Sequence, residues 1–411
     1  ETSSTKTDFT GGIADLYAEG AESSISNLTN SIAKADNFMM TNAPISDKAS
    51  LASGTSWDPN ISTLVRLKVY DDQATAEDAT ADNIYVERVV AKATVKVSND
   101  TENDYTLNVT NDAYPNAVVD FTNWKLQNTN KKTYLVRNVG TGKQAVWKQW
   151  IGYYNTSATK TVNRFVGETS DPYRTYWGID PNYKTVEGTN LGNNFNIWTA
   201  TNTDAEIGWN DVANNKTTNP DAEYCLENTC EANAMNKNQL TSVLLKATFY
   251  VNGKPSAGDD AESFFTVNNI SEIYTKDDML QALTVCLANS ETEGVPLAEN
   301  ESLQLKSAES GKNITSSTDL KAVFEVKTAN GVSELSDDQA NAILTSYNPI
   351  KYFKDGVTFY YTSLIEHFGE TYTPVAESST GSYTYNDNDH LGYFGVLRNN
   401  WYELNITEVS G

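Results

Sequence analysis

The sequence predicts a mainly β protein with two successive sandwich-like domains and a few short helices. Aromatic residues make up 11% of the 411 residues, with 23 Tyr and 8 Trp, and aromatic side chains favour pleated sheet. Several segments alternate apolar and polar residues with the period of two that is typical of a half-buried strand. The length suits two domains, at about 100–200 residues per domain.

The net charge is strongly negative, at −24 from 54 acidic and 30 basic residues. A phosphate backbone repels such a chain, and its densest basic segment, Lys131-Lys132, is a lone pair, so we expect no nucleic-acid partner. No segment approaches the roughly 20 apolar residues that span a bilayer. Residues 1–4 carry neither a signal peptide nor a lipidated cysteine, so we expect a secreted form to be a processed product.

The first region combines one helix with strands. Apolar residues recur on one helical face over residues 10–34, which predicts a helix. Alternation at 65–69 predicts a half-buried strand, and the acidic stretch 71–83 predicts a surface loop. The longest alternating run, 89–97, predicts the clearest strand. We place a domain boundary after it, giving an N-terminal β domain of residues 1–97 and a C-terminal domain of residues 98–411.

The second region begins with predicted strands at 105–109 and 118–126. A long segment from Trp147 to Cys230 is rich in Trp and Tyr but has few regular patterns. Loops of this length are uncommon unless they pack on themselves or serve a function, so we expect the aromatic residues to anchor the loops on the sheet. A further alternating strand, 243–251, ends at the hairpin-type turn signal Asn252-Gly253.

Two short helices are predicted within the later strands. The first carries an apolar stripe between Met279 and Leu287, which makes Cys286 a core residue. The second begins at Ser336 with a capping-box pattern and buries Ile343 and Leu344. Strands are predicted on either side of the second helix, at 323–326, 359–361 and 401–406.

The three cysteines do not form a disulfide framework. Cys225 and Cys230 are close enough in sequence to form a disulfide bond if the intervening loop turns back. An odd number of cysteines fits three free thiols equally well. The fold must therefore be stable through burial of apolar side chains.

The sequence offers little material for catalysis. Histidine is the usual base near neutral pH and the commonest metal ligand, and the chain has only His367 and His390. The run 386–390 could offer oxygen ligands to Ca²⁺, but a solvated polar loop is the better interpretation because an EF-hand glycine and glutamate are missing. A pair of catalytic carboxylates stays open, since 54 acidic residues offer many pairs. We expect no enzymatic activity, no cofactor and no bound metal.

Three segments together carry a resemblance to a known family. They are Phe38-Met39-Met40-Thr41 with Val86-Glu87-Arg88-Val89-Val90-Ala91-Lys92-Ala93, then Tyr173-Arg174-Thr175-Tyr176-Trp177, then Gly356-Val357-Thr358-Phe359-Tyr360-Tyr361 and His367 with Gly395-Val396-Leu397-Arg398-Asn399-Asn400-Trp401-Tyr402. In order and spacing these segments resemble the fimbrillins of Bacteroidetes, the type V pilus subunits, and among them the Mfa1-like major subunits. The resemblance spans most of the chain.

The resemblance implies two tandem β-sandwich-like, transthyretin-like domains and a structural role in a surface fimbria. A lipoprotein precursor would be exported to the outer membrane, lose an N-terminal segment to proteolysis, and accept a strand from the next subunit. Such fibres support adhesion and biofilm formation. The implied partners are other copies of the chain, accessory fimbrial subunits, and glycans or proteins of host or bacterial surfaces. The implied location is the extracellular cell-surface fimbrium.

The motif residues would then pair or pack within the sheets. They are Glu87, Arg88, Lys92, Arg398, Asn399, Trp401 and Tyr402. The chain departs from the family pattern at both ends, so we expect an incomplete N-terminal domain and a donor strand outside this sequence. The alternative function is a glycan-binding adhesin, such as a tip subunit or lectin-like lipoprotein, in which the aromatic residues between Trp147 and Trp209 stack on sugars.

Overall fold

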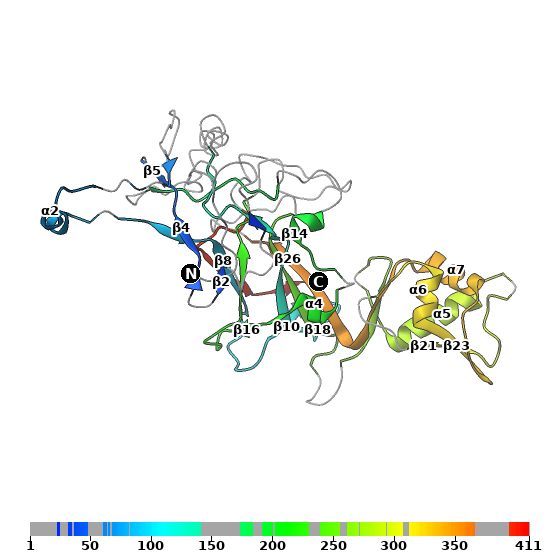
Figure 1. The fold of residues 1–411 in the computed structure, drawn as a ribbon. Helices are drawn as coiled ribbons and strands as arrows, with labels where there is room; N and C mark the ends of the chain where they lie inside the picture. The colour runs from blue at the N-terminus through cyan, green and yellow to red at the C-terminus, as the bar shows by residue number, and fades with distance from the viewer. Residues whose placement is uncertain are drawn as a thin grey trace, which may run out of the picture.

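The described residues of the computed structural model are 23–24, 32–34, 37–47, 61–63, 65, 68–81, 83–140, 173–183, 191–199, 202–229, 239–254, 261–270, 272–292, 294–306, 312–365 and 394–410. They form a mainly β structure, which confirms the predicted class, with five α-helices among them (Figure 1). None of these helices is both long and apolar enough to cross a membrane.

The larger of two central sheets has the strand order β26-β18-β10-β9-β28, and β15 also pairs with β10. β10 and β18 pair antiparallel along their whole length, with a bulge between Phe121 and Asn123. The strands are β9 (Thr106–Thr110), β10 (Val118–Gln127), β15 (Asn210–Asp211), β18 (Ser242–Tyr250), β26 (Val357–Leu364) and β28 (Val409–Ser410). The predicted strands in the regions of β9, β10, β18 and β26 are confirmed.

The smaller sheet is centred on β8 (Val90–Val97). One side of β8 pairs in parallel with β27 (Trp401–Ile406), and the other pairs with β17 (Ala222–Leu226) and β16 (Ala213–Asn214). Within the described part of the chain, β27 pairs with β8 alone. Both strands were predicted, and β27 has the predicted bounds.

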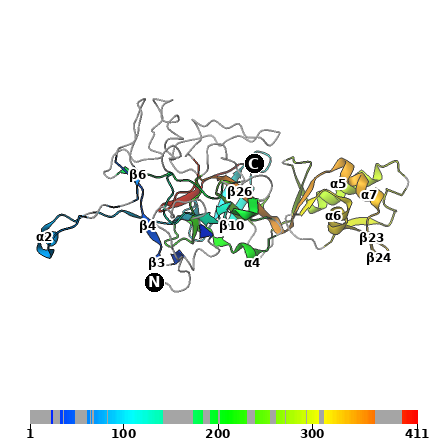
Figure 2. The same ribbon diagram turned by 45° about the horizontal axis from the view of Figure 1, so that its top comes forward.

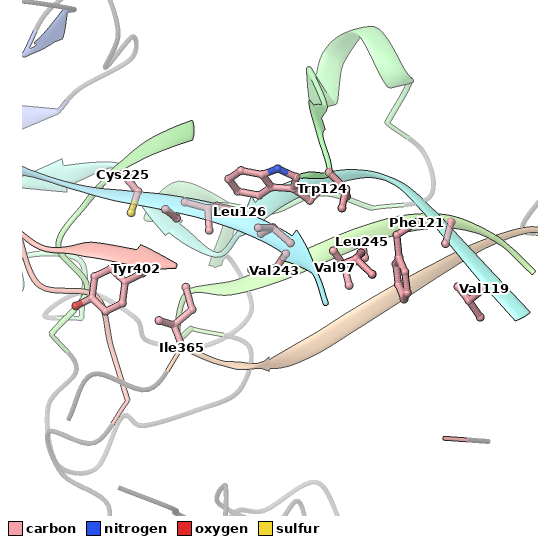
Figure 3. Packing of buried hydrophobic residues seen from close by; sticks show 14 of the residues in the cluster. Val97, Val119, Phe121, Trp124, Leu126, Cys225, Val243, Leu245, Ile365 and Tyr402 are labelled. Carbon is pink, nitrogen blue, oxygen red and sulfur yellow. The ribbon is translucent and has the colours of Figure 1, made fainter. Parts of the chain in front are cut away.

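One hydrophobic cluster, which we call the main cluster, receives side chains from both central sheets (Figure 3). β8 contributes Ala91, Ala93, Val95 and Val97, which follow the alternation that predicted the strand. The larger sheet contributes the side chains of Val119, Phe121, Trp124, Leu126, Val243, Leu245 and Ala247. Residues on both sides of the boundary expected after Val97 therefore lie in one cluster.

A second cluster belongs to a contiguous stretch, residues 264–353, which we call the module. It comprises β19 (Phe264–Val267), β20 (Ile273–Thr275), α5 (Lys276–Ala288), β21 (Ser302–Leu305), β22 (Lys312–Ile314), α6 (Ser317–Val323), β23 (Phe324–Thr328), β24 (Gly331–Ser333), α7 (Asp337–Ser346) and β25 (Ile350–Phe353). Figures 1 and 2 both show α5, α6 and α7 in a lobe to one side of the central sheets.

The module's elements follow from local sequence. α5 begins at the cap Thr275 and buries Met279, Leu283 and Leu287, which confirms the predicted stripe except at Cys286, which is only partly buried and not a core residue. The capping box predicted at Ser336 opens α7, which buries Ile343 as predicted but leaves Leu344 only partly buried. The predicted strand near Val323 is β23, and the helix before it, α6, was not predicted.

The module is inserted between two paired strands of the larger sheet. β18 precedes the module and β26 follows it, and Thr248 pairs with Val357. The Phe264 ring contacts Phe249 on the sheet side and stacks on Phe353 inside the module. A turn follows β18 at Val251 and Asn252, and Gly253 has a φ of 88°, but no hairpin results because β18 pairs with β10 and β26.

The N-terminal region differs from its prediction. The helix expected over residues 10–34 is contradicted at β1 (Ser23–Ser24) and β2 (Ala33–Lys34), and the rest lies outside the described residues apart from the turn at Ile32. β1 pairs with β12 (Lys132–Thr133) and β2 with β3 (Asn37–Phe38), so pairing with other segments overrides the local helical pattern.

The half-buried strand expected at 65–69 is also wrong where it is described, because Val69 is 93% exposed and Lys68 and Val69 lie in no strand. The acidic stretch after it is exposed as predicted but includes α2 (Gln73–Asp78). The remaining elements are β4 (Met40–Asn42), β5 (Ile45–Ser46), β6 (Ile61–Ser62), β7 (Val86–Arg88), β11 (Thr129–Asn130), β13 (Tyr173–Arg174), η3 (Leu191–Asn193), β14 (Phe195–Asn196), α4 (Asp204–Ile207) and η5 (Lys354–Gly356).

Candidate functional site

Four charged side chains that are far apart in sequence meet in the interior beside the central sheets. Glu87, Arg137, Glu227 and Arg398 are each at most 6% exposed. Glu87 lies in β7, Glu227 follows β17 directly, and Arg398 precedes β27, so three strands that pair with or adjoin β8 position three of the charges. We call these four residues the buried network.

The charges alternate along the network. The Glu227 carboxylate contacts Arg398 at 2.5 Å through Oε1 and Arg137 at 3.3 Å through Oε2. Arg137 reaches the second carboxylate, Glu87 Oε2, at 3.3 Å. Arg174, whose side chain is partly exposed, donates to the same oxygen at 3.2 Å. Each carboxylate therefore faces two guanidinium groups.

The guanidinium groups also fix the backbone. Arg398 donates to the carbonyl oxygens of Leu135 and Tyr134 at 2.8 and 2.7 Å and to the hydroxyl of Thr133. Arg137 donates to the carbonyl oxygen of Thr175 at 2.6 Å. The network therefore cross-links segments around residues 87, 135, 175, 227 and 398.

Electrostatics hold Glu227 in its charged form. Burial alone would raise its pKa, but the guanidinium groups of Arg398 and Arg137 outweigh that effect and lower the pKa of Glu227 below its ordinary value. Removing one partner of a buried pair costs about 3–5 kcal/mol because the other charge is left uncompensated. The arrangement suits a structural lock better than a base that must exchange protons.

A second buried carboxylate, that of Asp180, adjoins the network and forms no ion pair with any described residue. Asp180 accepts from Asn182 through its backbone and side-chain nitrogens at 2.8 Å, from Asn130 at 2.5 Å, and from the backbone of Thr229 at 3.1 Å. Burial raises the pKa of Asp180 to about 7, although these hydrogen bonds oppose the shift. Asn130 also donates to the Glu227 carbonyl, which links Asp180 to the network.

Asn228 extends this polar region towards the larger sheet. Its side-chain nitrogen donates to Gln239 O at 2.8 Å, and its side-chain oxygen accepts from the Tyr183 hydroxyl at 2.7 Å. Its backbone bridges to Val396, next to Gly395, whose φ is +134°. A Cβ on Gly395 would lie 2.5 Å from the Asn228 carbonyl oxygen, so only glycine allows this close approach.

The predicted motif residues divide between two places. Glu87 and Arg398 are in the buried network, and Tyr402 is buried in the main cluster, where its hydroxyl accepts from the Leu397 backbone. Arg88, Lys92 and Trp401 lie nearer the surface, with Trp401 58% exposed. Asn399 joins the two places: it has φ 64° and accepts from the Arg88 backbone through its side chain. Their structural role stays a prediction.

Of the two cysteines in the possible disulfide, only Cys225 lies among the described residues. Cys225 is a free thiol, buried in the main cluster on β17, and burial raises its pKa. Cys230 lies outside the described residues. The neighbouring strand β8 and the sheet opposite enclose the Cys225 side chain, which accounts for its burial. Cys286 is free and partly buried, with its sulfur 3.5 Å from the Ser346 hydroxyl.

Several other predictions fall outside the described residues. They concern His367, His390 and the run 386–390. Where the chain is described, no group of three His, Cys, Asp or Glu residues is arranged to hold a metal ion. In the aromatic-rich region, Trp177 is fully buried, and Trp198 donates to the Leu126 carbonyl. These two side chains contact the protein itself, as expected for anchors.

Sequence reasoning missed Arg137, Glu227 and Asp180. Arg137 stands between Val136 and Val139, and Glu227 follows Leu226, so each is an isolated charge beside apolar residues. A charged residue among apolar residues indicates a buried charge, and buried charges are usually paired. It does not identify the partners, since they lie 90 and 171 residues from Glu227 on either side, from the numbering of Arg137 and Arg398.

Comparison of the sequence with protein-family models and with curated proteins finds no match.

Proposed function

We propose that this chain is a structural subunit of a type V bacterial surface fimbria. Subunits polymerise head-to-tail by donating a strand after proteolytic processing, outside the cell, following export as a lipoprotein precursor. A head-to-tail contact uses two different surfaces and does not close, so it generates a filament. The ordered motifs that resemble fimbrillins give the family context for this proposal.

The unequal width of the two central sheets is the observation that carries the proposal. The smaller sheet ends at β27, whose outer edge pairs with no strand in the described ranges. Leu404 and Ile406 on β27 and Tyr360 on β26 pack against the main cluster but are only partly buried. An added strand beside β27 would give this edge a hydrogen-bonding neighbour and cover these side chains.

The buried network supports a structural role. A subunit that is held by strand exchange needs a body that keeps its open edge in place without the added strand. Glu87, Arg137, Glu227 and Arg398 fix the segments leading into β7, β8 and β27. Two sheets facing one cluster also support a sandwich-like, transthyretin-like topology for the central part of the chain.

Electrophoresis of material taken from the native cell surface tests the proposal. Unboiled samples should give a ladder of bands in SDS that collapses to a monomer only on boiling, because strand-exchanged polymers are kinetically locked. A single monomer band in both lanes would overturn the proposal.

A pair of variants on β27 locates the contact. Leu404→Glu places a charge where the added strand would pack and should shorten the ladder, whereas Asn405→Glu adds the same charge to the exposed side of the strand and should leave the ladder intact. Circular dichroism and the thermal midpoint of each monomer show whether it folds. Equal ladders from two folded variants would place the contact elsewhere.

A further inference from the structure

An acidic arm projects from the body of the protein. The arm, residues 69–85, leads out to α2 and back to β7, and both views place α2 at the end of two extended segments that lead away from the sheets (Figures 1 and 2). None of its described residues is buried. Its base is fixed by pairing of β7 with β4, as in Met40↔Arg88.

The arm has features of a segment that meets a partner. Val69, Ile84 and Tyr85 expose 93%, 54% and 38% of their surface, so the arm leaves apolar side chains in water. α2 has only six residues and buries none of them, although Asp72 caps its N-terminus. Isolated helices shorter than about 12 residues are marginal in water, so packing against another surface would stabilise this one.

The charge of the arm has one sign. Residues 69–85 include five acidic residues and no Lys, Arg or His. A partner surface should therefore combine cations with apolar or aromatic groups. Such a surface must also lie where the arm of another molecule can reach it.

The outer face of the smaller sheet has these properties. Lys92 lies 4.0 Å from the Trp401 ring and is the cross-strand neighbour of Tyr224. The Tyr224 ring contacts Phe38 at 5.1 Å, and the Arg88 guanidinium lies 5.2 Å from the Phe38 ring. We call these five residues the patch.

The patch is held in place and its charge is available. Trp401 donates from its indole nitrogen to Thr94 at 3.0 Å, which fixes the ring. Among the described residues, no carboxylate forms an ion pair with Arg88 or Lys92, whereas Lys96 on the same face pairs with Glu403. Exposed Trp and Arg side chains are typical of the energetic centres of interfaces.

We propose that the arm of one copy of this chain docks on the patch of a second copy. The acidic residues of α2 and its flanks meet Arg88 and Lys92, and the exposed apolar residues of the arm pack on the patch rings. Arg88 ends β7 at the base of the arm, while the tip leads away from its own body, so the tip meets a patch on another molecule. The contact uses the outer face of the smaller sheet, whereas strand donation uses the edge of β27. It is salt-sensitive because it joins exposed charges.

Sedimentation velocity on the purified full chain tests the proposal. Wild type should self-associate, and added salt should weaken the association. Arg88→Glu/Lys92→Glu and, separately, Glu77→Lys/Asp78→Lys should each weaken it by at least about tenfold. An equimolar mixture of these two double variants should associate again, because the unchanged acidic arm of the patch variant can then dock on the unchanged patch of the arm variant.

Controls separate this contact from net charge and from strand exchange. Glu291→Lys/Glu299→Lys makes the same charge change as the arm variant, but at exposed positions of the module. It should leave self-association unchanged. A photo-crosslinking benzoylphenylalanine at Ala76 should attach to the patch of the second copy. The arm contact does not survive SDS, so its failure leaves the unboiled ladder untouched.

Three results would overturn the proposal: a wild type that stays monomeric at every salt concentration, a mixture that does not associate, or crosslinks that map away from the patch.

Discussion

The central sheets and the module bury their residues by different means. In the module, residues 264–353, the one buried polar or charged side chain among the described residues is Gln339. The central part buries two arginines, two glutamates and Asp180 together with many amides and hydroxyls. The module is stabilised by apolar packing of neighbouring segments, whereas the central part is stabilised by apolar packing plus polar links between distant ones. The polar links between distant segments therefore help to specify which segments meet in the central part of the chain.

The largest expected effect concerns Arg398. Arg398→Ala should destabilise the central part by about 3–5 kcal/mol, because Glu227 would remain charged and buried with half of its compensation removed. Urea unfolding measures the change. Lys321→Ala breaks the more exposed pair with Asp337 in the module and should cost at most about 1 kcal/mol. Similar losses of stability in both variants would show that the buried pair matters no more than the exposed pair.

A core truncation in the module tests its independence. Leu283→Ala, at a fully buried position of α5, should cost about 2–5 kcal/mol within the module. Hydrogen exchange should show faster exchange for amides of residues 264–353 and unchanged protection in β8, β10 and β18. Faster exchange throughout both regions would mean that the two cores unfold as one unit.

Two glycines with nearly equal φ give a matched pair. Gly395, at φ +134°, would bring a Cβ against the Asn228 carbonyl, whereas Gly331 in the module, at φ +133°, has open space around it. Both alanine variants should be destabilised, each by more than about 1 kcal/mol for the backbone strain, and Gly395→Ala should lose clearly more. Thermal denaturation of the two variants gives the difference. Equal losses would show that the central part relaxes around the added methyl group.

The last expected effect is a pH dependence from Asp180. Its folded pKa of about 7 lies above the unfolded value, so the folded state binds the proton more tightly, and stability should fall as pH rises from about 4 to about 7. Asp180→Asn should flatten this fall in urea midpoints measured across that range. Asp204→Asn is the control of opposite sign, because hydrogen bonds from Lys246 and Trp209 lower the pKa of Asp204. An unchanged pH profile in Asp180→Asn would contradict the expectation.

The same contrast explains how far the sequence could predict the fold. α5, α7 and their caps follow from residues within one helix, and β8 and β27 follow from alternation within one strand. Ser23 and Ser24 take their conformation from pairing with Thr133 and Lys132, about 110 residues away, which no local pattern encodes. Val69 alternates like a strand residue, but no described strand pairs with it.

The candidate site could be predicted only in fragments. Glu87 and Arg398 were singled out by resemblance, but their mutual connection runs through Arg137 and Glu227, which lie in two other segments. A single sequence can indicate that a charged residue is buried, but it does not identify the residue that pairs with it. The insertion of the module could not be predicted for the same reason, because β18 and β26 pair across the whole length of the module.

That insertion has a consequence for how the chain can vary. Thr248 and Val357, the residues on either side of the module, are cross-strand neighbours, so the two attachment points are already as close as the ends of a hairpin. The central sheets would need only a tight turn to close if the module were absent. A cassette of different size or surface could therefore be grafted at this junction, altering what the protein displays while every backbone hydrogen bond of the supporting sheet is retained.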